Sequence, residues 1–418
     1  MRNGKRTRVL FLPPANGVSA GGSAGEAGRG VLSWKRIPSR DVTLEPTESL
    51  LEEKSTSYLE LFFDLVFVFA VTQVSALVRD DQTFAGLGRG SLLLLMLWWT
   101  WSLYTWTTNW TGTDSPGIKL SLIGAMAAAL VMSAAVADAF TTGGIWFAFS
   151  YLVVRIFVAA MYWMGSRRSI AQRAALMTFL PLSLLAPFVV LAGAYFDGTK
   201  RLVIWILAIV IDMLSAANAG RATWEIDPGH FAERNGLFVI IALGESIVAI
   251  GIGATLTDRR PQLVASLILA FAGAAVLWWS YFDRAARAAE EHLKNAEGQE
   301  RGRFARDAYT ILHLPIVIGI VLFAVAAEEV VAHPDQSLSP EIRFALVVGV
   351  GLVLLGIVAA AYRATHQVPY ERMAAAVAMV LLAFLAGGTR ADVLMAVVVL
   401  IVSLALWKER LNPRKEVI

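Results

Sequence analysis

The segment Ser57–Val78, SYLELFFDLVFVFAVTQVSALV, is apolar over the width of a membrane yet carries acidic residues inside that run. Glu60 and Asp64 stand one helical turn apart near its start, and Gln73 lies further along. A charged side chain that faced lipid at the bilayer centre would cost about 3 kcal/mol or more, so these groups are expected to face protein or water. The segment therefore predicts a membrane-spanning helix with a polar side turned inward.

The composition of the whole chain favours a membrane protein. Of its 418 residues, 57% are hydrophobic and only 17% are charged, a balance that excludes an ordinary soluble protein of this size. The formal net charge of +3 fits basic cytoplasmic loops, and we expect no nucleic-acid partner. The absence of cysteine excludes disulfides, thiol nucleophiles and iron–sulfur clusters.

Repeated apolar runs predict an all-α polytopic membrane protein with about 12 transmembrane helices. The basic region 1–53, rich in glycine and serine, is expected to be a disordered cytoplasmic tail rather than a signal peptide. The predicted spans form two groups of six, in regions 54–220 and 221–418: Leu59–Val78, Leu92–Trp110, Leu120–Phe140, Ile145–Met164, Ala174–Phe196 and Leu202–Ala219, then Phe231–Ala254, Leu263–Phe282, Tyr309–Glu328, Phe344–Tyr362, Met373–Gly387 and Ala391–Trp407.

Two features of the sequence predict how these spans are arranged: the distribution of Lys and Arg between the loops, and the similarity of the two halves. Lys and Arg are more frequent in the loops on the side of both termini, which predicts a cell-membrane protein with cytoplasmic termini. Short motifs recur in the same order in both halves, as when FVFAVTQ at Phe67–Gln73 is compared with VIIALGE at Val239–Glu245. The sequence therefore predicts two parallel six-helix repeats, related by an axis along the membrane normal.

Glu245 is predicted to lie near the middle of the bilayer, because it follows Glu233 at the helix start by about 18 Å of helix. A carboxylate at this depth is functional by default. Gly244 before it would let another helix approach closely, and Gln73 holds the corresponding place in the first half.

Arg155 and Asp212 are also predicted to lie deep, in the fourth and sixth spans. We expect Arg155 either to form a buried ion pair with Asp212 or Glu245 that fixes the bundle, or to belong to an ion pathway. If Arg155 neutralises one carboxylate, the other is left to carry protons. His313 is expected to be a core histidine, and four acids at span ends are expected to face water: Asp138, Asp283, Glu328 and Glu329.

Polar residues also mark the starts of the first and seventh spans. The pattern Ser57-x-x-Glu60 predicts a capping box. Asp227-Pro228 predicts a helix start that places His230, Glu233 and Arg234 in the first turns. His230 and Glu233 offer only two metal ligands, so a hydrogen-bonded cluster is favoured over a metal site. Without a phosphate loop, nucleophile elbow or histidine cluster, we predict no catalytic residue, metal or cofactor.

Two segments resemble the signatures of the low temperature requirement A (LtrA) family: ELFFDLVFVFAVTQ at Glu60–Gln73 and H-x-x-E-R-x-G-L-F-x-x-x-x-L-G-E-S at His230–Ser246. The resemblance extends over Leu59–Trp407 and implies a multi-pass membrane protein linked by its family name to growth in the cold. It marks seven signature positions: Glu60, Asp64, His230, Glu233, Arg234, Gly244 and Glu245. FFDLVF at Phe62–Phe67 is more faintly similar to a potassium-channel motif, Phe-Ser-Asp, although phenylalanine replaces the serine.

These features favour a transporter or channel-like protein with an ion or proton pathway between its halves, formed by Asp64, Glu245, Asp212, Arg155 and Gln73. One alternative is a membrane-embedded enzyme that acts on a lipid-like substrate beside Glu245 and His230. Another is a structural or sensory protein whose charges only hold the bundle. The expected partners are the lipid bilayer and an unidentified small ion or small molecule, and a homodimer is expected by analogy.

Overall fold

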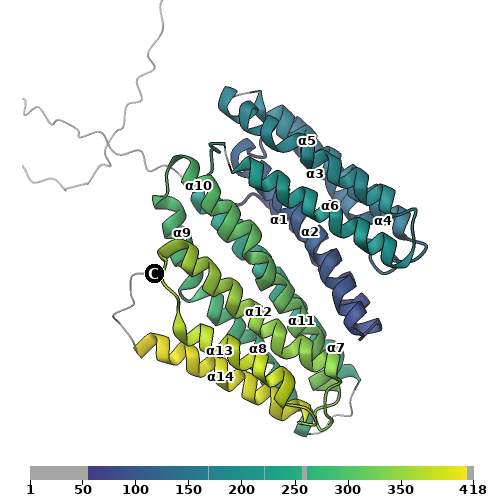
Figure 1. Ribbon diagram of the computed structural model, residues 1–418, viewed down its shortest axis with the longest axis vertical. Coiled ribbons are helices and arrows are strands. Elements are labelled where there is room, and N and C mark those ends of the chain that lie inside the picture. The colour runs from purple at the N-terminus through teal and green to yellow at the C-terminus, as the bar shows by residue number, and fades with distance from the viewer. Residues whose placement is uncertain (1–54, 168, 221, 257–260, 412–418) are drawn as a thin grey trace, which may run out of the picture. The chain divides into compact units, whose positions relative to one another are not determined.

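The computed structural model describes residues 55–167, 169–220, 222–256 and 261–411, so the predicted tail 1–53 lies outside the described residues. Within these ranges the chain is helical and contains no strand (Figure 1). The elements are α1 Tyr58–Asp80, α2 Phe84–Thr111, α3 Pro116–Ala134, α4 Gly144–Ser166, α5 Ile170–Gly193, α6 Gly198–Ala219, α7 Pro228–Thr255, α8 Pro261–Phe282, α9 Ala285–Asn295, α10 Gly298–Phe304, the π-helix η1 Ala305–Ile311, α11 His313–Ala332, α12 Pro340–Thr365, α13 Tyr370–Leu385 and α14 Ala391–Leu411.

Each predicted span overlaps a helix, which confirms the all-α membrane architecture. The ninth, Tyr309–Glu328, begins in η1 and continues into α11. In the described part of the chain, ten helices are long and apolar enough to cross a membrane. The other two predicted spans are α2 and α13. The second half of α2 is rich in Thr, Trp and Tyr, and α13 has only 16 residues.

The helix starts follow local sequence. Ser57 caps α1, and the predicted capping box with Glu60 is confirmed. Asp227 accepts a hydrogen bond from the His230 N–H at the start of α7, and Pro228 occupies the first helical position. The helix α12 begins in the same way, with Ser339 as the cap and Pro340 as the first helical residue.

The most enclosed span is α11, which packs against α1, α2, α7, α8, α12 and α14. Its contact with α12 depends on two glycines. A Cβ at Gly319 would lie 2.3 Å from the Gly349 carbonyl oxygen, and one at Gly349 would lie 2.8 Å from the Gly319 carbonyl oxygen. Small residues at these two positions let the helix backbones touch, as is common between membrane helices.

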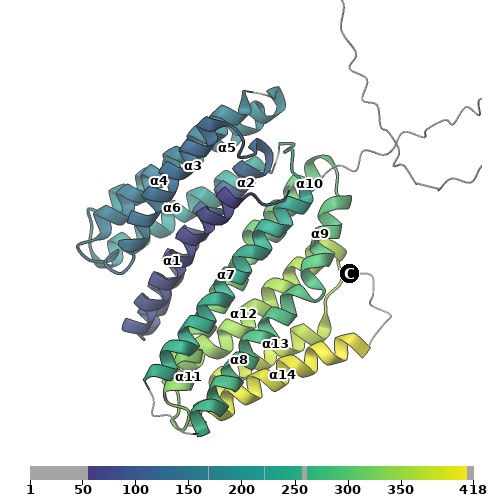
Figure 2. The same cartoon turned by 180° about the vertical axis from the view of Figure 1, so that it is seen from behind.

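The helices α1 and α7 run side by side and in the same direction (Figure 2). Their side-chain contacts stay in register, because Glu60 meets His230, Asp64 meets Arg234 and Thr72 meets Glu245. Neighbouring helices also pack in the same order in both halves, with α1 on α3, α3 on α4 and α4 on α5, and α7 on α11, α11 on α12 and α12 on α13. This order agrees with two parallel repeats, and the repeat itself stays a prediction.

Candidate functional site

The first polar group of the α1–α7 interface lies at the start of both helices. The Glu60 carboxylate accepts a hydrogen bond from the Ser57 backbone N–H at 2.9 Å, and its two oxygens lie 3.1 and 3.3 Å from His230 Nε2. Both side chains are almost fully buried. Glu60 therefore caps α1 and also joins it to α7.

The tautomer of His230 follows from its neighbours. The backbone N–H of Asp227 donates to Asn109 Oδ1 at 2.9 Å, which fixes the orientation of the Asn109 amide. The Asn109 NH₂ group then faces the Asp227 carbonyl oxygen at 2.9 Å and His230 Nδ1 at 3.1 Å. Because Nδ1 accepts this bond, the proton of a neutral His230 is on Nε2 and points at Glu60.

Glu233 does not join His230. Its side chain is at the protein surface and accepts a hydrogen bond from the Thr56 backbone N–H at 3.0 Å. Nowhere in the described ranges do three or more His, Asp or Glu side chains gather as metal ligands would. The polar cluster at the start of α7 contains the hydrogen bonds of Asn109 with Asp227 and His230, and the contact of His230 with Glu60.

Asp64 and Arg234 form a buried pair one turn deeper. Arg234 Nη2 donates to Asp64 Oδ1 at 2.8 Å, and Nη1 bonds to Oδ2. Trp101 Nε1 of α2 donates to the same Oδ1 at 2.8 Å, and its ring lies 5.5 Å from the Arg234 guanidinium carbon. Asp64 therefore faces protein, and its charge is balanced across the α1–α7 interface.

Arg155 and Asp212 form a second buried pair, between α4 and α6. Arg155 Nη2 donates to Asp212 Oδ1 at 2.6 Å, and Nη1 donates to Oδ2 at 2.8 Å. Tyr151 and Ser183 take its remaining hydrogen bonds. Of the two partners that the sequence left open for Arg155, the structure shows Asp212 and not Glu245.

Glu245 differs from both pairs because no basic side chain binds it within the described residues. Its exposed fraction is 4%, and Thr72 Oγ1 of α1 donates to its Oε2 at 2.6 Å. Gln73 beside Thr72 is half-buried and makes no side-chain hydrogen bond with a described residue. Thr72 was not singled out from the sequence, although it adjoins Gln73 in the repeated motif.

The expected close helix approach at Gly244 is wrong. A Cβ at Gly244 would meet no atom within 4 Å, because this residue faces away from the neighbouring helices. The close approach occurs on the opposite side of α7, where a Cβ at Gly253 would lie 2.5 Å from the Glu328 carbonyl oxygen.

The expectation that Glu328 faces water is also wrong. Its exposed fraction is 5%, and Arg79 at the end of α1 donates to its carboxylate at 3.0 Å. The prediction for His313 is confirmed, because the side chain is buried in the core. Its Nδ1 lies 2.7 Å from the Ala308 carbonyl oxygen, and its Nε2 lies 2.6 Å from the Tyr281 hydroxyl oxygen.

The deep charges of the described chain thus form separate groups. No hydrogen bond or ion pair between described residues joins Asp64, Asp212 and Glu245 to one another. His230 and Glu245, fifteen residues apart on α7, are separated by about 22 Å along the helix. These two residues are therefore too far apart to act on one bond as an acid–base pair.

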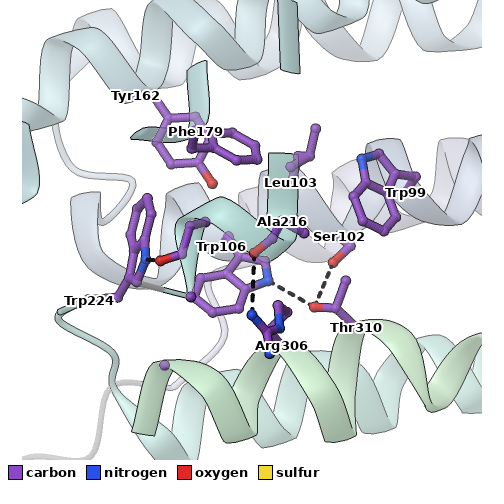
Figure 3. Close-up of a pocket in the computed structure, with 13 residues that line it drawn as sticks. Trp99, Ser102, Leu103, Trp106, Tyr162, Phe179, Ala216, Trp224, Arg306 and Thr310 are labelled. Carbon is purple, nitrogen blue, oxygen red and sulfur yellow. Dashed lines mark hydrogen bonds between the residues drawn. The ribbon is translucent and has the colours of Figure 1, made fainter. Parts of the chain in front are cut away.

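A small cavity next to the π-helix η1 is lined by aromatic side chains of α2, α4 and α5 (Figure 3). Thr310 of η1 accepts a hydrogen bond from Trp106 Nε1 at 2.9 Å and is 3.2 Å from the Ser102 hydroxyl. The cavity has a volume of about 40 Å³, which suits a water molecule rather than a substrate. Its polar contacts join α2 to η1.

Sequence reasoning missed two buried arginines. Arg201 at the start of α6 precedes the predicted span Leu202–Ala219, yet its guanidinium donates to the carbonyl oxygens of Ala139 and Ala194. Arg372 near the start of α13 bonds to Glu409 and to the Ser280 carbonyl oxygen. Both lie within a turn of a helix start, where sequence alone does not separate a buried arginine from an exposed one.

Comparisons with known proteins agree with this architecture. The family model described as bacterial low temperature requirement A protein (LtrA) matches residues 55–407. An uncharacterised protein of Rhizobium meliloti (strain 1021) is 32% identical over 301 residues, which cover 68% of this chain and 72% of the relative. No solved structure matches the chain.

Proposed function

The chain belongs to the bacterial LtrA family of membrane proteins, and we propose that it is a transporter or channel-like protein for a proton or a small cation, with Glu245 as the coupling group. The single observation that carries this proposal is the state of Glu245. It is buried near the middle of an apolar helix without a basic partner among the described residues. A carboxylate in that position is costly and therefore implies a role.

The place of Glu245 supports the same proposal. It lies on α7 and meets Thr72 of α1, so it sits where the amino-terminal and carboxy-terminal halves touch. Toward the start of both helices the interface carries Asp64, Arg234, Glu60 and His230. The contact between the two halves thus carries polar groups at three levels, and at one of them, Glu245, no basic side chain of the described residues balances the acid.

The two neutralised pairs have a different role in this proposal. Asp64 and Asp212 each face an arginine that balances their charge. We assign Arg155 and Asp212 to holding α4, α5 and α6 together, and Asp64 and Arg234 to fixing the register of α1 on α7. The orientation with cytoplasmic termini, taken from the Lys and Arg bias of the loops, belongs to the proposal as well.

The proposal is tested by flux through the purified protein in liposomes. Proton, sodium and potassium gradients are imposed in turn, and flux is followed for wild type and for Glu245→Gln. We expect the variant to lose the flux of one ion while it keeps the fold. The control is Glu329→Gln, which removes a partly exposed carboxylate at the end of α11 that is paired with His333. Equal flux in wild type and Glu245→Gln would refute the assignment.

A further inference from the structure

A second cavity, of about 540 Å³, lies between the first turns of α7, the end of α8, the start of α9 and η1. One part of its wall is apolar and is formed by Leu237, Ile240 and Phe282. Other parts carry Glu233, Arg287 and Tyr309. None of these residues belongs to the buried ion pairs described above, so the cavity is a separate feature.

The cavity presents one unbalanced charge of each sign. Glu233 accepts a hydrogen bond from the Thr56 backbone N–H, and Arg287 donates to the Asp283 carbonyl oxygen. In the part of the chain that the structure describes, neither of the two forms an ion pair. Glu290, which also lines the cavity, is already paired with Lys294 at 2.9 Å. A ligand that fits this wall therefore carries a negative and a positive group.

Tyr309 supplies a further polar group that lacks a partner. Its exposed fraction is 1%, and its hydroxyl makes no hydrogen bond with a described residue. The neighbouring Tyr281 lines the same cavity, but its hydroxyl is bound to His313 Nε2. A buried hydroxyl without a partner is unfavourable, so an oxygen-bearing ligand in the cavity would be stabilised by Tyr309.

The position of the cavity indicates what kind of molecule brings these groups. It lies where the apolar helices α7 and α8 begin and end, the level at which lipid headgroups meet a membrane protein. Ile240 is 44% exposed and continues the apolar wall along α7, away from the polar residues. The ligand therefore has a polar end at the helix termini and an apolar tail along the span.

We propose that this cavity binds one phospholipid whose headgroup carries both a phosphate and a primary ammonium group, as in phosphatidylethanolamine. Arg287 and the Tyr309 hydroxyl bind the phosphate oxygens, since guanidinium groups recognise phosphate through charge-assisted hydrogen bonds. Glu233 binds the ammonium group. The acyl chains lie against Leu237, Ile240 and Phe282.

One substitution fills the cavity with little disturbance of the helix. A Cβ at Gly236 would lie 3.5 Å from Phe282 Cε1, an ordinary contact, so Gly236→Leu extends into the cavity from a tolerated position. Gly251 on the same helix is exposed, and a Cβ there would meet no atom within 4 Å. Gly251→Leu is therefore the matched control, since both changes replace a helical glycine by the same good helix former.

Binding is measured by native mass spectrometry of delipidated full-length protein, to which phosphatidylethanolamine or phosphatidylglycerol with the same acyl chains is added. We expect wild type and Gly251→Leu to bind one phosphatidylethanolamine more tightly than phosphatidylglycerol by about tenfold, the worth of one charge-assisted hydrogen bond. Gly236→Leu loses this tight binding. Glu233→Gln removes the preference between the lipids, and Arg287→Met weakens the binding of both.

Two outcomes would overturn the proposal. The first is equal binding of the two lipids by wild type, or a preference for phosphatidylglycerol, which would indicate a site for anionic lipid only. The second is unchanged phosphatidylethanolamine binding by Gly236→Leu. Unfolding curves of the variants in detergent show that any loss of binding arises in a folded protein.

Discussion

The ion pair of Arg155 and Asp212 gives a prediction whose size follows from the structure. Arg155 makes five hydrogen bonds: two to Asp212, two to Ser183 and one to Tyr151. Both charged side chains are almost fully buried: the exposed fraction is 1% for Arg155 and 0% for Asp212. Removing one partner leaves the other charge buried and unpaired, which costs about 3–5 kcal/mol.

We therefore expect Arg155→Met and Asp212→Leu each to lower the free energy of unfolding by about 3–5 kcal/mol. The double variant leaves no unpaired charge. Beyond the ion pair itself, it removes the hydrogen bonds that Arg155 makes with Tyr151 and Ser183. Its loss should therefore be no larger than that of either single variant. The coupling energy between the two positions is then at least about 3 kcal/mol.

The assay is unfolding of the purified protein by sodium dodecyl sulfate in mixed micelles, followed by far-UV circular dichroism. The control pair is Arg89 and Asp81, whose side chains are 39% and 31% exposed. Changes there should cost no more than about 1 kcal/mol. Additive losses at Arg155 and Asp212, or single losses as small as those of the control, would contradict the account of a buried charged pair.

Two further predictions rest on single contacts. In nitrogen NMR of protein with labelled histidines, neutral His230 should carry its proton on Nε2, because Asn109 donates to Nδ1. His313 should carry its proton on Nδ1, which faces the Ala308 carbonyl oxygen. A proton on Nδ1 of neutral His230 would show that the Asn109 contact is wrong, and one on Nε2 of neutral His313 would refute its contact with Ala308. Gly349→Leu should destabilise the protein by about 1–3 kcal/mol, because its side chain would push α12 away from Gly319 of α11. A Cβ at Gly88 would meet no atom within 4 Å, so Gly88→Leu should have little effect on the same unfolding curve. Equal curves for the two variants would rule out a close α11–α12 contact.

The membrane helices could be predicted from the sequence because an apolar run long enough to span a bilayer must satisfy its backbone hydrogen bonds internally, as a helix does. All twelve predicted spans are helices, even α2, where Trp and Thr dilute the apolar run. The capping box at Ser57 and Glu60 was also predictable, since it depends on residues three positions apart.

The partners of the buried charges could not be predicted in this way, because they depend on which helices touch. Arg155 had two acids at suitable depth, and only the packing of α4 on α6 selects Asp212. Glu328 stands four residues before the end of α11 and would be expected at the surface. It is buried because Arg79 comes from the last turn of α1 and because α7 packs closely against its carbonyl group at Gly253.

The deep acids differ in whether they can change charge without losing their partners. Asp64 and Asp212 each accept hydrogen bonds from an arginine, which donates only, so a proton on either acid would oppose a guanidinium donor. Glu245 is bound by the Thr72 hydroxyl, which can donate to a carboxylate or accept from a protonated acid. Thr72 can therefore hydrogen-bond to Glu245 in both its ionised and its protonated form from the same position. Because a coupling group has to gain and lose its proton or cation in every cycle, Glu245 suits that role, and the two acids paired with arginine suit structural roles.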